Sequence, residues 1–221
     1  MCPTAPGELA LAIAASLWKS HIIDPRIGDT KHEYARSQID HFVRGPQGLH
    51  WTWEDPYRGD SDFAWCGAFA AYCWGGAGLI ERWRLPFWAS TYRLDRWASY
   101  RPIGRTHNPP PNPGQSTRLY CRFDGQSSAR DLDTMGIVPL PGDILLIGDS
   151  HSGYGRHIAM VDSYDSGNGI FTTIEGNAIG ILANGIRGQG VIKSKRYLGE
   201  TNPLDSRHVR RLIRPAASDL A

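Results

Sequence analysis

An excess of charge of either sign is missing from this chain of 221 residues. Lysine and arginine together number 24 and aspartate and glutamate 22, so the formal net charge is only +2. Proteins that bind nucleic acid usually gather far more positive charge than this. We therefore expect no nucleic-acid partner, although a mildly basic chain remains compatible with a polyanionic surface.

Cysteine is also scarce. The chain has four cysteines, at positions 2, 66, 73 and 121. Their spacing is irregular and no Cys-x-x-Cys pair occurs, so the chain lacks the usual patterns of a disulfide framework and of a structural zinc site. We expect neither a metal nor an organic cofactor.

Long hydrophobic runs are absent as well. The apolar run near the start of the chain, from Leu9 to Trp18, is too short to cross a membrane. No lysine or arginine precedes it and Glu8 stands at its edge, which makes it a poor secretory signal. We therefore expect no membrane insertion, and synthesis in the cytoplasm without a signal peptide.

The elements that are present divide into helices first and strands second. Helices are predicted from Glu8 to Ser20, over residues 30–43, around Cys66 and from Ser90 onward. Short apolar runs predict strands over 142–148, 156–163, 169–177, 191–197 and 207–214. This order is typical of α+β proteins, so we predict N-terminal helices packed on a C-terminal antiparallel sheet of about five or six strands.

Regular periodicity disappears between Arg101 and Leu140. The stretch includes the segment Pro109–Gly114, whose prolines favour extended or turning backbone. No second hydrophobic core follows it. We interpret residues 101–140 as one long surface insertion, and residues 1–221 as a single domain.

A nucleophile is suggested by the stretch from Ser61 to Trp74. Ser61 or Asp62 can cap a helix, which would place Cys66 near the start of that helix. Unpaired N–H groups and the helix dipole favour an anion there, and the thiolate is the reactive form of cysteine. The alternative is an inert core cysteine in a buried helix, which is the reading that we expect for Cys73.

Candidate partners of the thiol lie far downstream, on strand-like segments. Side chains alternate along a strand, so His157 can meet Glu175 or Asn177 if their two strands are neighbours. A cysteine, a histidine base and a polar group that orients the histidine are the components of a cysteine nucleophile site. His151 is a rival for the base, and Glu175 to Asn177 could instead be a polar turn.

Four short motifs follow one another in an order that resembles the CHAP family, the cysteine, histidine-dependent amidohydrolases/peptidases. The motifs are Trp65-Cys66-Gly67-Ala68-Phe69, Pro141-Gly142-Asp143-Ile144, Arg156-His157-Ile158-Ala159-Met160-Val161 and Thr173-Ile174-Glu175-Gly176-Asn177. The resemblance implies a papain-like fold, with Cys66 as nucleophile, His157 as base, and Glu175 and Asn177 as the polar pair behind it. Residues 101–140 depart from the family, which usually has a short connection there, and we expect no wall-binding module beside this domain.

The resemblance implies a peptidoglycan hydrolase that cuts an amide bond in the peptide stem or at the junction of stem and glycan. Such an enzyme would act in the periplasm or cell wall of a target or host bacterium, as a phage lysis enzyme or as a toxin injected by a secretion machine. For a toxin we expect an immunity protein that covers the cleft. The alternatives are a cytosolic cysteine protease or acyltransferase, and a non-catalytic wall-binding module of the same fold.

Overall fold

The computed structural model describes residues 5–20, 65–78, 91–99, 119–124, 126–148, 156–199 and 207–215. In these residues the helices are α1 (Pro6–Lys19), α3 (Cys66–Gly76), α4 (Thr91–Ser99) and α5 (Ala129–Thr134). The strands are β1 (Leu119–Arg122), β2 (Ile144–Gly148), β3 (His157–Asp165), β4 (Ile170–Ile181), β5 (Arg187–Tyr197) and β6 (His208–Arg214). The helix predicted over residues 30–43 lies outside the described residues.

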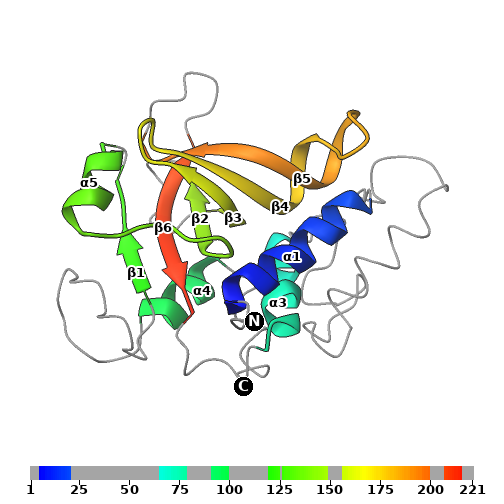
Figure 1. Cartoon of the computed structure of the whole chain (residues 1–221), viewed down its shortest axis with the longest axis horizontal. Coiled ribbons are helices and arrows are strands. Elements are labelled where there is room, and N and C mark those ends of the chain that lie inside the picture. Colours follow the sequence, from blue (N-terminus) through cyan, green and yellow to red (C-terminus); the bar gives the residue numbers. More distant parts are fainter. Residues whose placement is uncertain are drawn as a thin grey trace.

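The strands form one antiparallel sheet of six strands in the order β1-β6-β2-β3-β4-β5 (Figure 1). The predicted α+β class with an antiparallel sheet is therefore confirmed. All five residues of β2 are buried, which explains why its sequence is a continuous apolar run without alternation. No helix in the described part of the chain is long and apolar enough to span a membrane.

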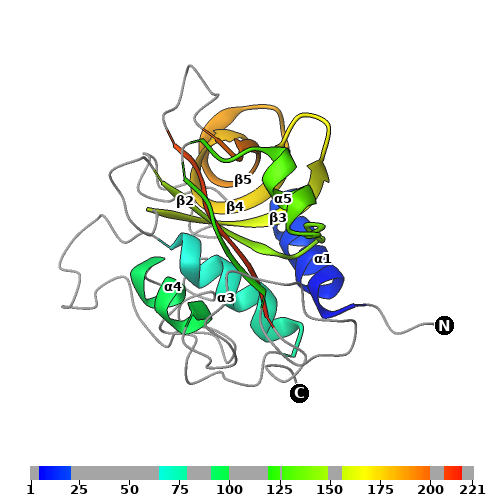
Figure 2. The same ribbon diagram turned by 90° about the vertical axis from the view of Figure 1, so that its left-hand side faces the viewer.

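Each face of the sheet carries its own hydrophobic core, because successive strand residues point to opposite faces. On one face, side chains of β2, β3 and β4 pack against α1 and α3, with Ile144, Met160 and Ile174 among them. On the other face, Val161 and Phe171 join a second cluster that includes Leu132 of α5. Figure 2 shows α3 and α5 on opposite sides of the sheet.

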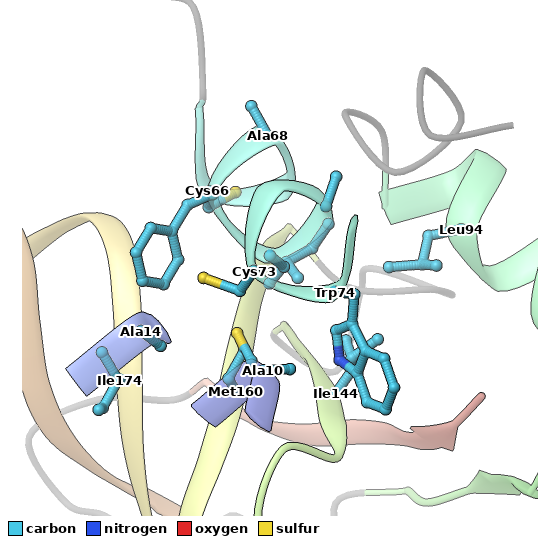
Figure 3. Close-up of a cluster of buried hydrophobic side chains, with 14 of the residues drawn as sticks. Ala10, Ala14, Cys66, Ala68, Cys73, Trp74, Leu94, Ile144, Met160 and Ile174 are labelled. Atoms are coloured by element: carbon cyan, nitrogen blue, oxygen red, sulfur yellow. The ribbon is translucent and has the colours of Figure 1, made fainter. Parts of the chain in front are cut away.

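Helix α3 is buried almost completely, as expected for a helix that is apolar on all sides. Its small residues Gly67, Ala68, Ala70 and Ala71 allow the close approach of α1 and of strands β3 and β4. Figure 3 shows Cys73 pointing from this helix into the core that also contains Met160 and Ile174. The prediction that Cys73 is a core residue is confirmed.

The prediction that residues 101–140 form a surface insertion without regular structure is wrong for their second half. Strand β1 pairs with β6 along its whole length, and α5 follows with a capping box between Ser128 and Asp131. Buried side chains of this stretch belong to the second core: Leu119, Cys121, Phe123, Leu132 and Ile137. A strand of four residues and a helix of six are too short to show a period in the sequence. Residues 101–118 and 125 lie outside the described residues.

The Pro141-Gly142-Asp143 motif joins this segment to β2 and has a structural role. Gly142 has a φ of 87°, and a Cβ there would overlap the carbonyl oxygen of Gly7 at the start of α1. Arg214 donates from Nε and Nη2 to the two carboxylate oxygens of Asp143, both at 2.7 Å. The motif therefore fixes the start of β2 against α1 and β6.

Candidate active site

Cys66 is the first residue of α3, where backbone N–H groups lack partners within the helix. Its side chain is 3% exposed. Backbone N–H groups of Gly67 and Ile158 donate hydrogen bonds to its sulfur. Trp65 is the N-cap and makes no side-chain capping bond, so the helix begins later than a cap at Ser61 or Asp62 would require. Those two residues lie outside the described residues.

His157 is the first residue of β3 and pairs with Ile147 of β2. Its Nε2 lies 2.9 Å from Oε2 of Glu175, while the ring also forms a hydrogen bond with the Cys66 thiol. Because Nε2 is engaged by the carboxylate, Nδ1 is the nitrogen left for the sulfur. The rival base His151 lies outside the described residues.

Glu175 is completely buried, and several donors surround its carboxylate. Besides His157, Arg196 of β5 donates from Nε to Oε1 at 2.7 Å and from Nη2 to Oε2 at 2.5 Å. The hydroxyl of Thr173 donates to Oε1 at 2.5 Å. Sequence reasoning gave Arg196 no place in the site, because the local pattern of β5 does not show which of its residues lies beside Glu175.

Asn177 occupies a different position from Glu175, although both lie on β4. The pairing of β4 with β5 shifts between Glu175 and Ala178, and Asn177 has a φ of 55°, in the left-handed region. Its Oδ1 accepts a hydrogen bond from Nε2 of Gln189 at 2.9 Å. The structure thus brings Cys66, His157 and Glu175 together, and it directs the Asn177 side chain to Gln189.

Gly176 lies between these two residues and meets the start of α3. A Cβ at Gly176 would lie 2.6 Å from Cζ3 of Trp65 and 2.7 Å from Cβ of Phe69, distances that real side chains do not show. Only glycine therefore allows β4 to approach the helix terminus that carries Cys66. Sequence reasoning included this glycine in a motif but missed its packing role.

The electrostatics of the three groups favour a thiolate and imidazolium pair. Burial by itself raises the pKa of the Cys66 thiol, but His157, together with the backbone N–H groups of Ile158 and Gly67, more than offsets this and the pKa falls below its ordinary value. Burial lowers the pKa of His157, but the Cys66 thiolate and Glu175 raise it to about 9. Burial also disfavours ionised Glu175, and its hydrogen bonds from Arg196 and His157 hold its pKa far below the usual range.

The pKa values of the Cys73 and Cys121 thiols shift in the opposite direction from that of Cys66. Burial raises the pKa of Cys73 well above that of an ordinary thiol, and it raises the pKa of Cys121 to about 12. Within the described parts of the chain, no group of three or more His, Cys, Asp or Glu side chains could hold a metal ion. Among the described cysteines, Cys66 is the one whose thiol has a lowered pKa.

Comparison with protein-family models, with curated proteins and with solved structures finds no match to this chain. Its function is therefore inferred from the site and from the sequence motifs.

Proposed function

We propose that this chain is a CHAP-like cysteine amidase or endopeptidase with a papain-like fold, which hydrolyses an amide bond of peptidoglycan. The observation that carries the proposal is the contact of Cys66 with His157, whose Nε2 is bonded to the buried Glu175. A nucleophile, a base and a group that orients the base are the parts that covalent amide hydrolysis needs.

In the proposed reaction the Cys66 thiolate attacks the carbonyl carbon of the scissile amide, and His157 holds the proton that came from the thiol. The backbone N–H of Cys66 at the helix start stabilises the oxyanion that forms. His157 then gives its proton to the leaving amine as the C–N bond breaks, which leaves a thioester on Cys66. Water, deprotonated by His157, hydrolyses the thioester, releases the acid and restores the thiol.

The substrate class is supported by the order of the four motifs and by the mild positive charge of the chain, which suits a polyanionic wall. The scissile bond lies in the peptide stem or joins the stem to the glycan. A phage lysis enzyme and an injected toxin both fit this activity, and a toxin would require a cognate immunity protein in the producing cell.

The direct test is digestion of isolated sacculi by the purified, reduced protein, with mass spectrometry of the released fragments. We expect release of peptides or of peptide-free glycan by the wild type and none by Cys66→Ala. Cys73→Ala is the matched control, because it removes a buried thiol from the same helix and should retain activity. If sacculi of several wall chemistries yield no fragments, the peptidoglycan proposal is abandoned.

Expression in two compartments separates this proposal from its rivals. A peptidoglycan hydrolase should be nearly harmless in the cytoplasm of a Gram-negative host and should round or lyse cells when it is fused to an export signal. A cytosolic protease would be toxic in the cytoplasm, and a wall-binding module would behave the same with Cys66 or with alanine. Because an oxidising periplasm can trap Cys66 in a disulfide, the sacculus assay with reduced protein is the reference.

A further inference from the structure

Arg196 binds the carboxylate of Glu175 through two parallel hydrogen bonds, from Nε to Oε1 and from Nη2 to Oε2. The Arg196 side chain is 12% exposed and that of Glu175 is completely buried. Bidentate pairs of this kind fix orientation as well as charge. We propose that Arg196 is a positioning residue, which holds Glu175 as an ionised acceptor so that His157 presents Nδ1 to Cys66. This inference deepens the proposed function and rests on it.

The argument depends on which nitrogen of His157 carries the proton. An ionised carboxylate only accepts hydrogen bonds, whereas a protonated one can donate. With Glu175 ionised, the proton of the neutral ring must lie on Nε2, and Nδ1 keeps the lone pair that takes the thiol proton. If Glu175 were protonated and donated to Nε2, the ring proton would move to Nδ1 and the base would be blocked.

A cation is needed because a completely buried carboxylate otherwise tends to take up a proton. In the described part of the chain, the charged or titratable groups that face Glu175 are His157 from β3 and Arg196 from β5, and Cys66 of α3 acts on it through His157. Thr173 on the same strand as Glu175 adds a hydroxyl donor but no charge. When His157 gives its proton to the leaving amine, Arg196 still balances the charge of Glu175.

A purely structural role for Arg196 would also make its loss harmful, so a matched ion pair is needed as a control. Arg214 makes the same kind of bidentate pair with the buried Asp143, at the opposite end of β2 from the pairing with His157. Arg214→Gln should therefore destabilise the fold without changing the ionisation of Cys66. This variant separates a general loss of stability from an effect on the site.

The experiment compares Arg196→Gln, Arg196→Lys and Arg214→Gln with the wild type. The rate of Cys66 alkylation by iodoacetamide is followed against pH by peptide mapping, and 15N NMR of His157 reports which ring nitrogen is protonated. Neither measurement needs peptidoglycan, so the inference can fail or stand separately from the proposed substrate. Hydrolysis of sacculi is measured in parallel, and circular dichroism checks that each variant is folded.

The alkylation rate of Cys66 rises with pH as the thiol ionises, and we call this rise the acid limb. We expect Arg196→Gln to shift the midpoint of the acid limb upward by about one pH unit or more, because a nearby positive charge has been removed. Its neutral His157 should move toward protonation on Nδ1, and hydrolysis should fall by about a hundredfold. Arg196→Lys should have the same acid limb as the wild type and hydrolyse about tenfold more slowly, since an ammonium keeps the charge but cannot form the two parallel hydrogen bonds. Arg214→Gln should have the same acid limb of Cys66 alkylation as the wild type, and its neutral His157 should stay protonated on Nε2.

An unshifted acid limb together with unchanged Nε2 protonation in Arg196→Gln would overturn the inference. If that variant does not fold, Arg196→Lys provides the test. Hydrolysis and Nε2 protonation equal to those of the wild type would show that the two parallel hydrogen bonds to Glu175 are dispensable, and would overturn the inference. An equal shift in Arg214→Gln would assign the effect to lost stability and would also overturn the inference. Expected alkylation and NMR results without hydrolysis of sacculi would reject the substrate and retain the role of Arg196.

Discussion

Two thiols on the same helix differ in their chemistry because they meet different neighbours. Cys66 and Cys73 are both buried, and burial alone raises the pKa of each. Cys66 differs because it stands at the helix start, where it accepts backbone N–H bonds and contacts His157. Cys73 points into the apolar core (Figure 3), and burial keeps its pKa well above that of an ordinary thiol. Reactivity at this scale is set by position along the helix and not by exposure.

We expect the alkaline pH dependence of hydrolysis to report on His157. Its pKa is raised to about 9, so above that pH the ring loses the proton that the leaving amine needs, and hydrolysis should fall. The Cys66 thiolate persists there, so its alkylation by iodoacetamide should stay fast. Both rates can be measured from about pH 5 to about pH 10.5. If the alkylation rate fell over the same pH range as the hydrolysis rate, the alkaline loss of hydrolysis would not be caused by deprotonation of His157.

The site is assembled where the N-terminus of α3 meets the irregular part of β4. Gly176 and Asn177 of β4 together stand opposite one residue of β5, so one extra residue breaks the pairing directly after Glu175. Such irregularities re-aim side chains, which explains why Glu175 faces His157 while Asn177 reaches Gln189. Gly176 then leaves room for Trp65 and Phe69, so helix and strand can approach closely enough for the thiol to meet the imidazole.

We expect Gly176→Ala to damage the site more than the fold. The added methyl must push Trp65 and Phe69 away, which costs about 1–3 kcal/mol in the free energy of unfolding. A displacement of Cys66 on the order of 1 Å should reduce hydrolysis by about a hundredfold. Urea unfolding and the sacculus assay measure the two effects.

Gly180→Ala is the matched control on the same strand. There the new Cβ meets the end of the flexible Ile192 side chain, which can move aside, and the change is farther along β4 from Glu175. It should keep near wild-type hydrolysis. If Gly176→Ala were equally active, the close approach at Gly176 would not position Cys66.

At the scale of the whole molecule, the sheet separates two hydrophobic cores. The core on the α1 and α3 face includes Cys66, and the core on the other face is completed by β1, α5 and the segment that follows α5. The second half of the stretch 101–140 is therefore part of the fold and not an appendage on it. The candidate site draws on both faces: Cys66 belongs to the core on the α1 and α3 face, whereas His157 and Glu175 alternate with Ile158 and Ile174 of that core and so lie on the opposite face.

Because Leu132 packs in the second core and is not a residue of the candidate site, we predict that Leu132→Ala lowers stability without changing the ionisation of the Cys66 thiol. Leu132 is completely buried in the second core, and its truncation should reduce the free energy of unfolding by about 2–5 kcal/mol. The pH profile of Cys66 alkylation should stay that of the wild type at temperatures where the variant is folded. Val138→Ala in the same stretch is the control, because Val138 is 69% exposed and its change should cost no more than about 0.5 kcal/mol. A Leu132→Ala protein as stable as Val138→Ala would contradict the role given to this stretch.

Much of the fold and of the candidate site could be predicted from local patterns. Apolar runs identified strands β2 to β6, because a strand that is buried on one or both faces must be apolar there. The same alternation selected Glu175 and Asn177 as possible partners of His157, but it could not choose between them, since both share one face of a regular strand. Strand β1 and α5 were not predicted, because elements this short carry too little periodic signal.

The α+β class, the helix that carries Cys66 and the strand that carries His157 can be predicted from local sequence, since each depends on residues that are close together in the chain. Three features appear only in the folded molecule: Glu175 lies behind His157, Arg196 binds Glu175, and Gly176 leaves room for the start of α3. These contacts join α3 and strands β3, β4 and β5, which are far apart in sequence. Their geometry depends on the register shift in β4 and on close packing against α3, and neither leaves a periodic signal in the sequence.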